Sequence, residues 1–267
     1  MIRPLRAGEA FLADVEAATG PLDLWWLGQS GFLVAHEGRH LLLDPYLSDS
    51  LTRKYAGTDK PHVRMTERVI EPERLGFVDV VTASHGHTDH LDPDTLPALN
   101  ATLVAPAAHR ELAAERAGRE PTTIDDGETV TVAGFEITAV PAAHETIERD
   151  DAGRMLHLGY VVRCGPFSLY HAGDTIPYDG QAERVGGGID VALLPINGRA
   201  AERGVAGNLH GEEAATLAHA IGARLAVPMH FEMFEFNTEP PDAFVAACER
   251  LGQPYRVLRA GERLTLP

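Results

Sequence analysis

Two features are scarce in this chain, and each shortage narrows what the protein can be. The 267 residues include only two cysteines, Cys164 and Cys248, and neither belongs to a C-x-x-C pair. A disulfide framework is therefore not expected, and a reducing cytoplasm is the predicted location. Long apolar runs are also missing, since no stretch approaches the roughly 20 apolar residues that span a bilayer. The N-terminal segment "MIRPLRAGEAFLADVEAATG" lacks an apolar core of signal-peptide length.

Positive charge is in short supply as well. The chain has 23 Lys and Arg against 39 Asp and Glu, which gives a formal net charge of -16 at pH 7. A surface this acidic repels nucleic-acid phosphates and anionic lipid head groups. We therefore expect a small-molecule substrate, with neither nucleic acid nor membrane as a partner. The sequence leaves a homo-oligomer open.

The chain is well supplied with short apolar segments, and 44% of its residues are hydrophobic. We find no linker, low-complexity tract or fixed-period repeat, so one compact α/β domain over residues 1–267 is predicted. Alternating and buried runs bounded by turn residues indicate strands, while 3.6-residue periodicity indicates helices that would cover the sheets. The predicted strands are 22–27, 31–35, 40–45, 78–84, 101–106, 128–132, 135–143, 157–163, 167–174, 190–196 and 224–230. The predicted helices are 108–118, 210–222 and 241–252, with a further helix start at Asp92-Pro93.

One heptapeptide, "SHGHTDH" at residues 84–90, holds three histidines and an aspartate directly after an apolar run. Loops at strand ends carry function because the sheet holds them rigidly. His85 and His87 are two positions apart, so in an extended segment they point the same way and can bind one ion. Asp89 and His90 can turn toward a second ion. Neutral imidazole and carboxylate suit divalent zinc, manganese or iron.

Four ligands cannot complete two metal shells, and three further candidates occupy the same kind of position. His144, Asp174 and His230 each follow an apolar run, in "AVPAAH", "YHAGD" and "AVPMH". Packing alone does not explain five histidines and two aspartates at four strand ends. Asp44, in "LLLDPY", ends another strand and is expected to orient a ligand from behind.

With this set of residues the sequence resembles the metallo-β-lactamase superfamily, whose HxHxDH signature appears here as "HGHTDH". The resemblance implies a four-layer αββα sandwich with two divalent ions, manganese or zinc, at one edge. It implies that His85, His87 and His144 bind one metal, that Asp89, His90 and His230 bind the second, and that Asp174 bridges both. "LDPYLSDS", "LLPINGR" and "PMHFEMFEFNT" further resemble the branch typified by L-ascorbate-6-phosphate lactonase, which is usually manganese-dependent.

Two ions that share a water lower its pKa enough to supply hydroxide near neutral pH. We expect Asp89 and Asp174 to take part in catalysis, with His210 as a further donor at a helix start. Asn208, Arg199 and Arg203 are the candidate substrate-binding residues. The polar segment 48–64, which is predicted to be a long loop that could close as a lid, adds Arg53, Lys54 and Arg64 as candidate anion binders.

Other histidines and the two tryptophans have structural interpretations. His171 is expected to pack behind the site, and most of the remaining histidines are expected at the surface or in packing positions: His36, His40, His62, His109, His157 and His219. Of Trp25 and Trp26, at least one is expected in the core.

Three functions remain open at this point. The first is a dinuclear hydrolase that opens a lactone or related ester, which could be a phosphorylated sugar lactone. The second keeps the metals and cleaves a small or lipid-like phosphodiester. The third is a metal-holding or redox protein without hydrolytic activity; we rank it last because oxygen-reducing diiron relatives usually carry a flavin domain, for which this chain has no room.

Overall fold

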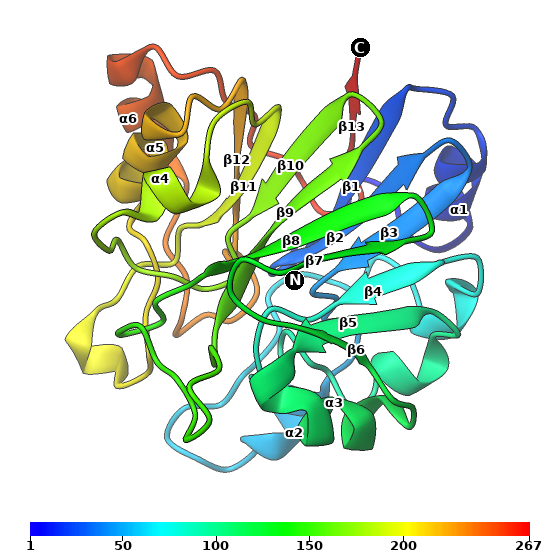
Figure 1. Ribbon diagram of the computed structural model, residues 1–267. Coiled ribbons are helices and arrows are strands. Elements are labelled where there is room, and N and C mark those ends of the chain that lie inside the picture. The colour runs from blue at the N-terminus through cyan, green and yellow to red at the C-terminus, as the bar shows by residue number, and fades with distance from the viewer.

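The apolar segments assemble into two sheets in the computed structural model, which describes residues 1–267 (Figure 1). The first sheet has the strand order β13-β1-β2-β3-β4-β5-β6. Its strands are β1 Leu22–Gly28, β2 Gly31–His36, β3 Arg39–Leu43, β4 Val80–Thr82, β5 Thr102–Pro106, β6 Thr122–Ile124 and β13 Arg263–Leu266. The second sheet has the order β12-β11-β10-β9-β8-β7. Its strands are β7 Thr129–Val132, β8 Phe135–Pro141, β9 Leu158–Cys164, β10 Phe167–His171, β11 Val191–Pro195 and β12 Leu225–Met229.

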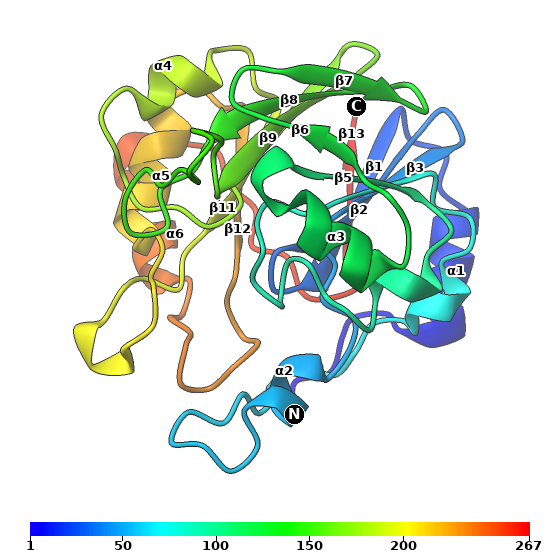
Figure 2. The same ribbon diagram turned by 60° about the horizontal axis from the view of Figure 1, so that its bottom comes forward.

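Helices cover the outer faces of the two sheets. In Figure 1, α1 lies beside the first sheet, while α4, α5 and α6 lie beyond β11 and β12 of the second; Figure 2 shows α3 in front of β5 and β6. The helices are α1 Gly8–Glu16, α2 Ser50–Lys54, α3 Arg110–Ala117, α4 Gln181–Val185, α5 Gly211–Ala220 and α6 Asp242–Leu251. Short 3₁₀ helices add η1 Pro72–Arg74, η2 Leu96–Ala98, η3 Ala107–His109 and η4 Ala201–Arg203. The predicted αββα sandwich is confirmed.

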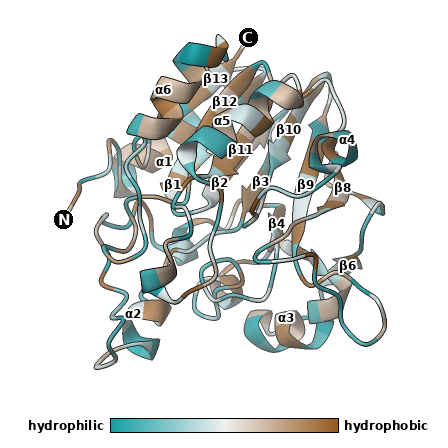
Figure 3. Cartoon of the chain, turned by 90° about the vertical axis from the view of Figure 1, so that its left-hand side faces the viewer, coloured by the Kyte–Doolittle hydropathy of each residue, from teal (hydrophilic) through white to brown (hydrophobic).

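The core is continuous between and around the sheets and contains 67 buried hydrophobic residues. The strands accordingly carry most of the apolar colour in Figure 3, whereas the loops at one end of the sheets are largely hydrophilic. Both tryptophans are buried: Trp25 packs edge-on to Phe11, and Trp26 stacks on Phe231 with ring centroids 4.7 Å apart. None of the helices combines the length and apolar character needed to cross a membrane.

Strand direction brings distant segments of the chain to one edge. In the first sheet β1 and β3 are each antiparallel to β2, and β4 is parallel to β3, so β1, β3 and β4 end on the same side. In the second sheet β8 and β10 are each antiparallel to β9, while β11 and β12 run parallel to β10. Loops after β1, β3, β4, β8, β10 and β12 therefore emerge where the hydrophilic loops gather.

Two predictions of local structure are wrong. Asp92-Pro93 starts no α-helix; a turn and the short η2 follow it. The reason is that the Asp92 carboxylate is fully buried and accepts hydrogen bonds from the hydroxyls of Ser48, Ser50 and Thr95, which ties it to the loop after β3. That loop is also more ordered than predicted, because α2 forms within segment 48–64.

Candidate metal centre

The seven predicted ligands converge at the shared edge of the two sheets. His85, His87, Asp89 and His90 follow β4, while His144, Asp174 and His230 follow β8, β10 and β12. Their side chains form three overlapping groups in which one nitrogen or oxygen of each residue lies within 4.8 Å of the others. The groups are His85–His87–His144, His85–His90–Asp174 and Asp89–His90–His230. The first and third match the two ligand sets that the resemblance implies.

Asp174 lies between these sets. Its Oδ1 is 3.3 Å from His90 Nε2, and its Oδ2 is 3.2 Å from His230 Nε2 and 3.8 Å from His144 Nε2. One carboxylate thus reaches imidazoles of both sets, as a bridging ligand must.

A buried carboxylate behind the cluster orients two of the imidazoles. Asp44 is fully buried, accepts a hydrogen bond from the backbone N–H of Ser84 at 2.9 Å and lies 2.7 Å from His90 Nδ1. Since a carboxylate only accepts, His90 donates from Nδ1, and Nε2 is the nitrogen that it turns toward the cluster. The Ser84 hydroxyl also donates to Asp44 and so accepts from His85 Nδ1, 3.0 Å away. The orienting role expected for Asp44 is present in this geometry.

The third imidazole is fixed in the same way by a backbone carbonyl. His144 Nδ1 lies 3.0 Å from the carbonyl oxygen of Gly207, which can only accept. The proton is therefore on Nδ1, and Nε2 is free to face the cluster, where it lies 3.2 Å from His87 Nδ1. Metal-binding histidines typically donate the N–H of the other ring nitrogen to a carboxylate or a backbone carbonyl.

Three residues at this edge have left-handed backbone conformations that side chains other than glycine rarely adopt. Gln29 has a φ of 50°, Asp44 of 39° and His230 of 61°. Such strain persists where the surrounding structure enforces it and gathers at functional sites. Here the backbone N–H of His230 donates to the carbonyl of Gln29 at 2.9 Å, which links the end of β12 to the end of β1.

The glycine inside the signature has a steric role. A Cβ on Gly86 would lie 3.0 Å from the ring of His109, whose Nε2 is 2.9 Å from the Leu156 carbonyl. Arg116, on α3, donates to the Gly86 carbonyl at 2.9 Å and to the Leu91 carbonyl at 2.9 Å, which closes the signature loop. His109 and Arg116 therefore shape the loop that presents the ligands.

Desolvation sets the charge of two ligands in the first set. Burial and the neighbouring imidazoles hold the pKa of His85 well below its usual value, and partial desolvation lowers the pKa of the more exposed His87. Both rings are therefore neutral at pH 7, which is the form that binds a metal.

In the second set, two histidines lie beside two carboxylates that favour their protonated form. Burial opposes a charge on His90 and His230, but Asp174 and Asp89 outweigh it, raising the pKa of His230 to about 9 and that of His90 well above its usual value. Burial likewise opposes ionisation of Asp89 and Asp174, and these two imidazoles nevertheless lower both carboxyl pKa values. The cluster thus favours cations, and a divalent ion fits its mixture of imidazole and carboxylate donors.

Buried polar atoms support this fit. His85 Nε2, His90 Nε2 and Asp174 Oδ1 are buried and have no hydrogen-bond partner in the protein. These are the atoms left free once Asp44, Ser84 and the cluster geometry have used the others. Unpaired buried nitrogens and oxygens cost free energy unless something else binds them, and a metal ion would bind all three.

Sequence reasoning missed Gln29 at this site. Its Nε2 lies 2.7 Å from Asp89 Oδ2 and 3.1 Å from His230 Nε2, and its own carbonyl accepts from the indole of Trp26. Gln29 directly follows β1, so its place at a strand end was visible. Glutamine is an uncommon metal ligand, so its residue type gives no signal of a metal site.

His157, predicted at the surface or in packing, lies against the ligands. Its ring centroid is 5.1 Å from that of His85 and 5.3 Å from that of His144, and burial with nearby imidazoles lowers its pKa to about 3. It precedes the antiparallel strand β9, whose start lies at the same edge as the ends of β8 and β10. Strand starts in a hairpin can therefore supply site residues as well.

A cavity of about 280 Å³ lies over the cluster. Its walls combine five predicted ligands with parts of two loops, 51–62 and 205–208. The lining residues include His87, Asp89, His144, Asp174, His230, Lys54, Tyr55, His62, Val205, Ala206, Asn208 and Asn237.

Hydrogen bonds hold the loop that contains α2 in place at two points, its base and its tip. Half-buried Arg64 donates to the Ser48 carbonyl at 2.6 Å and to Asp49 at 3.1 Å, so it anchors the loop. At the tip Lys60 donates to the Gly204 carbonyl at 2.9 Å, which joins the loop to the one that contains η4.

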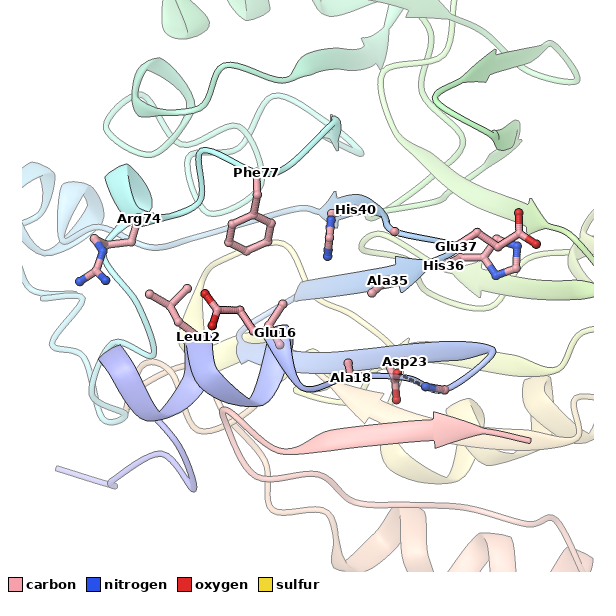
Figure 4. A pocket seen from close by; sticks show the side chains of 13 residues that line it. Leu12, Glu16, Ala18, Asp23, Ala35, His36, Glu37, His40, Arg74 and Phe77 are labelled. Atoms are coloured by element: carbon pink, nitrogen blue, oxygen red, sulfur yellow. Dashed lines mark hydrogen bonds between the residues drawn. The ribbon is translucent and has the colours of Figure 1, made fainter.

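A larger cavity of about 540 Å³ lies elsewhere, between α1 and the β2–β3 hairpin (Figure 4). Leu12, Glu16, His40 and Phe77 line it, and it contains none of the predicted site residues. We identify the smaller cavity as the site because the metal-ligand groups open into it.

The structure does not bring three of the predicted residues to this cavity. Arg199 forms a two-pronged ion pair with Glu213 at 2.5 and 2.6 Å, and Arg203 pairs with Glu239 at 3.3 Å. His210 precedes α5, and its Nδ1 lies 3.4 Å from Glu239. Lys54 and Asn208 do line the cavity.

The outer loop offers fewer anion-binding groups than predicted. Arg53 pairs with Asp94 and lies outside the lining of the cavity, and Arg64 is the anchor described above. Lys54 lies 5.2 Å from the ring centroid of Tyr55 and makes no ion pair. His171 lies behind the site, fully buried, with Nε2 2.8 Å from the Ser30 carbonyl.

Fold and ligand clusters together define a metal-dependent hydrolase architecture, and comparison with known proteins agrees. A model described as a beta-lactamase superfamily domain matches residues 23–230. A UPF0173 metal-dependent hydrolase of Opitutus terrae is 35% identical over 252 residues, which cover 91% of this chain and 99% of the relative. The chain belongs to the metallo-β-lactamase superfamily and, within it, to the UPF0173 metal-dependent hydrolases.

Several solved structures share this fold, and their names describe different hydrolases. Igni18, a metallo hydrolase from Ignicoccus hospitalis, has a TM-score of 0.66 at 22% identity, covering 92% of this chain and 98% of that one. An isothiocyanate hydrolase from Delia radicum gut bacteria has a TM-score of 0.73 at 18% identity, covering 91% and 99%. At these identities the likeness concerns the fold alone.

Proposed function

We propose that the protein is a dinuclear metal hydrolase that opens a lactone or a related ester. The observation that carries the proposal is the set of three overlapping histidine and aspartate groups, with Asp174 reaching both ligand sets. His85, His87 and His144 would hold one divalent ion and Asp89, His90 and His230 the other. Bound manganese or zinc ions would supply hydroxide near neutral pH and stabilise a developing oxyanion.

The chain's own groups prepare this chemistry. Asp44, Ser84 and the Gly207 carbonyl each hold the Nδ1 of His90, His85 and His144, so each ring turns its Nε2 toward the cluster. Asp89 lies 2.7 Å from Gln29 Nε2, which holds its carboxylate toward the cluster.

Absence of free guanidinium groups favours an ester over a phosphodiester. Arg116, which lines the cavity, donates to two backbone carbonyls, and Arg199 and Arg203 are paired with carboxylates. A phosphodiester keeps a negative charge that only the bound metal ions and Lys54 could balance in this cavity, whereas a lactone brings none. Lys54 is the observation that favours a small phosphodiester as a second candidate, because its ammonium group makes no ion pair and lines the cavity.

Hydrolysis assays on manganese-loaded and zinc-loaded protein test the proposal. The panel pairs plain and phosphorylated sugar lactones with simple phosphodiesters, and Asp174→Asn serves as the blank. Lactone opening that is lost in the variant supports the proposal, and phosphodiester cleavage alone supports the second candidate. Iron in the purified protein with visible absorbance and no hydrolysis would instead favour a redox role.

A further inference from the structure

One wall of the cavity contains an amide whose orientation is set by its neighbours. Asn208 is 1% exposed and lines the cavity, and it adjoins Gly207, whose carbonyl fixes His144. Its Nδ2 donates to Asn197 Oδ1 at 2.9 Å. Its Oδ1 is buried and has no partner within the protein. A fully buried amide with one half bonded and the other half free requires an explanation.

A hydrogen-bonded chain of three side-chain amides and one guanidinium determines that the oxygen of Asn208, and not its NH₂ group, lacks a partner. Arg203, which has only N–H donors, lies with Nη1 3.5 Å from Asn237 Oδ1 and also donates to the Asn197 carbonyl. Asn237 Oδ1 therefore accepts, and it also accepts from Asn197 Nδ2 at 3.0 Å. Asn197 must then turn its Oδ1 toward Asn208, so that Asn208 donates to it.

The anchor of this chain is itself fixed. Arg203 Nη2 lies 3.3 Å from the Thr238 carbonyl and 3.3 Å from Glu239 Oε1, and its side chain is 15% exposed. Flipping the Asn208 amide would place its oxygen against Asn197 Oδ1 and two acceptors would meet. Arg203 thus acts through two amides to keep Asn208 in one orientation.

We propose that Asn208 Oδ1 is a substrate-recognising acceptor that selects esters carrying a hydroxyl or N–H group beside the scissile bond. The inference rests on the proposed hydrolase function and specifies its substrate class as hydroxylated lactones. A substrate hydroxyl that reaches the buried oxygen from the cavity would satisfy it, whereas a plain alkyl ester leaves it unpaired. The oxygens of a phosphodiester only accept, so they face Asn208 Oδ1 without a proton between them.

The test compares two lactones with the same six-membered ring. D-Glucono-1,5-lactone carries hydroxyl groups, and δ-valerolactone carries none. With metal-loaded full-length protein we expect kcat/KM to favour the hydroxylated lactone, and Asn208→Ala to reduce that preference about 10- to 100-fold. The exposed Asn100→Ala, which removes an amide at the surface, is the matched control and keeps the preference.

A second pair of variants separates positioning from simple loss of packing. Asn197→Ala removes the acceptor of Asn208 Nδ2, so the amide is free to turn and the preference falls. Asn197→Asp keeps an oxygen facing Asn208 Nδ2 but loses the donor to Asn237 Oδ1, and it is expected to retain more of the preference than Asn197→Ala. Equal loss on both lactones in Asn208→Ala, or equal behaviour of the two Asn197 variants, overturns the inference.

A binding measurement keeps this inference separate from the hydrolase proposal. Calorimetry compares D-gluconate with hexanoate, which have the same chain length and carboxylate. Preferential gluconate binding that is lost in Asn208→Ala supports the acceptor role even when neither lactone is opened, in which case only the lactonase proposal fails. No preference for gluconate in the wild-type protein overturns the inference.

Discussion

Replacing Asp44 with asparagine should weaken metal binding although Asp44 is not a ligand. Its two oxygens accept from three donors: the Ser84 N–H, the Ser84 hydroxyl and His90 Nδ1. An asparagine has one oxygen and one NH₂ group, so one side of the side chain must now face a donor with a donor. If the NH₂ faces His90, the ring accepts at Nδ1 and moves its proton to Nε2, the atom that faces the cluster.

The magnitude follows from this change of tautomer. Substitutions behind a ligating histidine typically cost about 10- to 100-fold in metal affinity, or about 1.4 to 2.8 kcal/mol. If the NH₂ instead faces the Ser84 N–H, affinity is spared but a buried charge-assisted hydrogen bond is lost, which costs about 1.5 to 3 kcal/mol of folding free energy. Either orientation therefore lowers one of two measurable quantities, the metal affinity or the free energy of unfolding.

The assay combines chelator competition for zinc and manganese with thermal unfolding of the metal-free protein. Asp94→Asn is the control, because Asp94 is partly exposed and pairs with Arg53 at the surface. A variant at Asp44 that matches wild type in both metal affinity and unfolding temperature would refute the orienting role.

Three further predictions concern charge. Metal affinity should rise with pH up to about 9. The reason is that Asp174 and Asp89 raise the pKa of His230 to about 9, and His230 must lose a proton to bind a metal. Calorimetry in buffers of different ionisation enthalpy counts the protons released on binding. In metal-free protein the same raised pKa contributes stability below about pH 6.5, and that contribution is lost as pH rises toward 9, so an unfolding temperature unchanged over this window contradicts the assignment. Lys54→Met should raise KM for an anionic substrate about 3- to 10-fold and leave neutral lactones little affected, whereas Arg53→Gln, which lies outside the cavity, should change neither. Equal effects of both variants would show that the charge of the whole loop matters and not Lys54.

The convergence of the seven candidate ligands was predictable because two local signals coincide at these positions. Histidine and aspartate side chains bind metals, and the apolar runs before them predict buried strands. His144, Asp174 and His230 are separated by tens of residues, yet a strand end places each of them without knowledge of the sheet order. Short elements were not predictable: α4, β6 and β13 have 5, 3 and 4 residues, too few for a periodic pattern.

The surroundings of the ligands depend on pairings that sequence patterns do not contain. Arg199 and Arg203 looked like anion binders because guanidinium groups near a site suit anions. Only the folded chain shows that Glu213 and Glu239 neutralise them. An ion pair between residues 14 or 36 positions apart leaves no periodic trace, so charge near a site predicts a binder only when its partners are known.

These pairings also change what the site can recognise. With Arg203 committed to Asn197, Asn237 and Glu239, its charge no longer attracts substrate anions, and it acts instead by fixing the amide of Asn208. The same residue that the sequence suggested as a phosphate ligand thus supports an acceptor, which phosphate would not favour. Selectivity at this wall therefore follows from hydrogen-bond direction, while bound metal ions would supply the hydroxide that attacks the ester carbonyl.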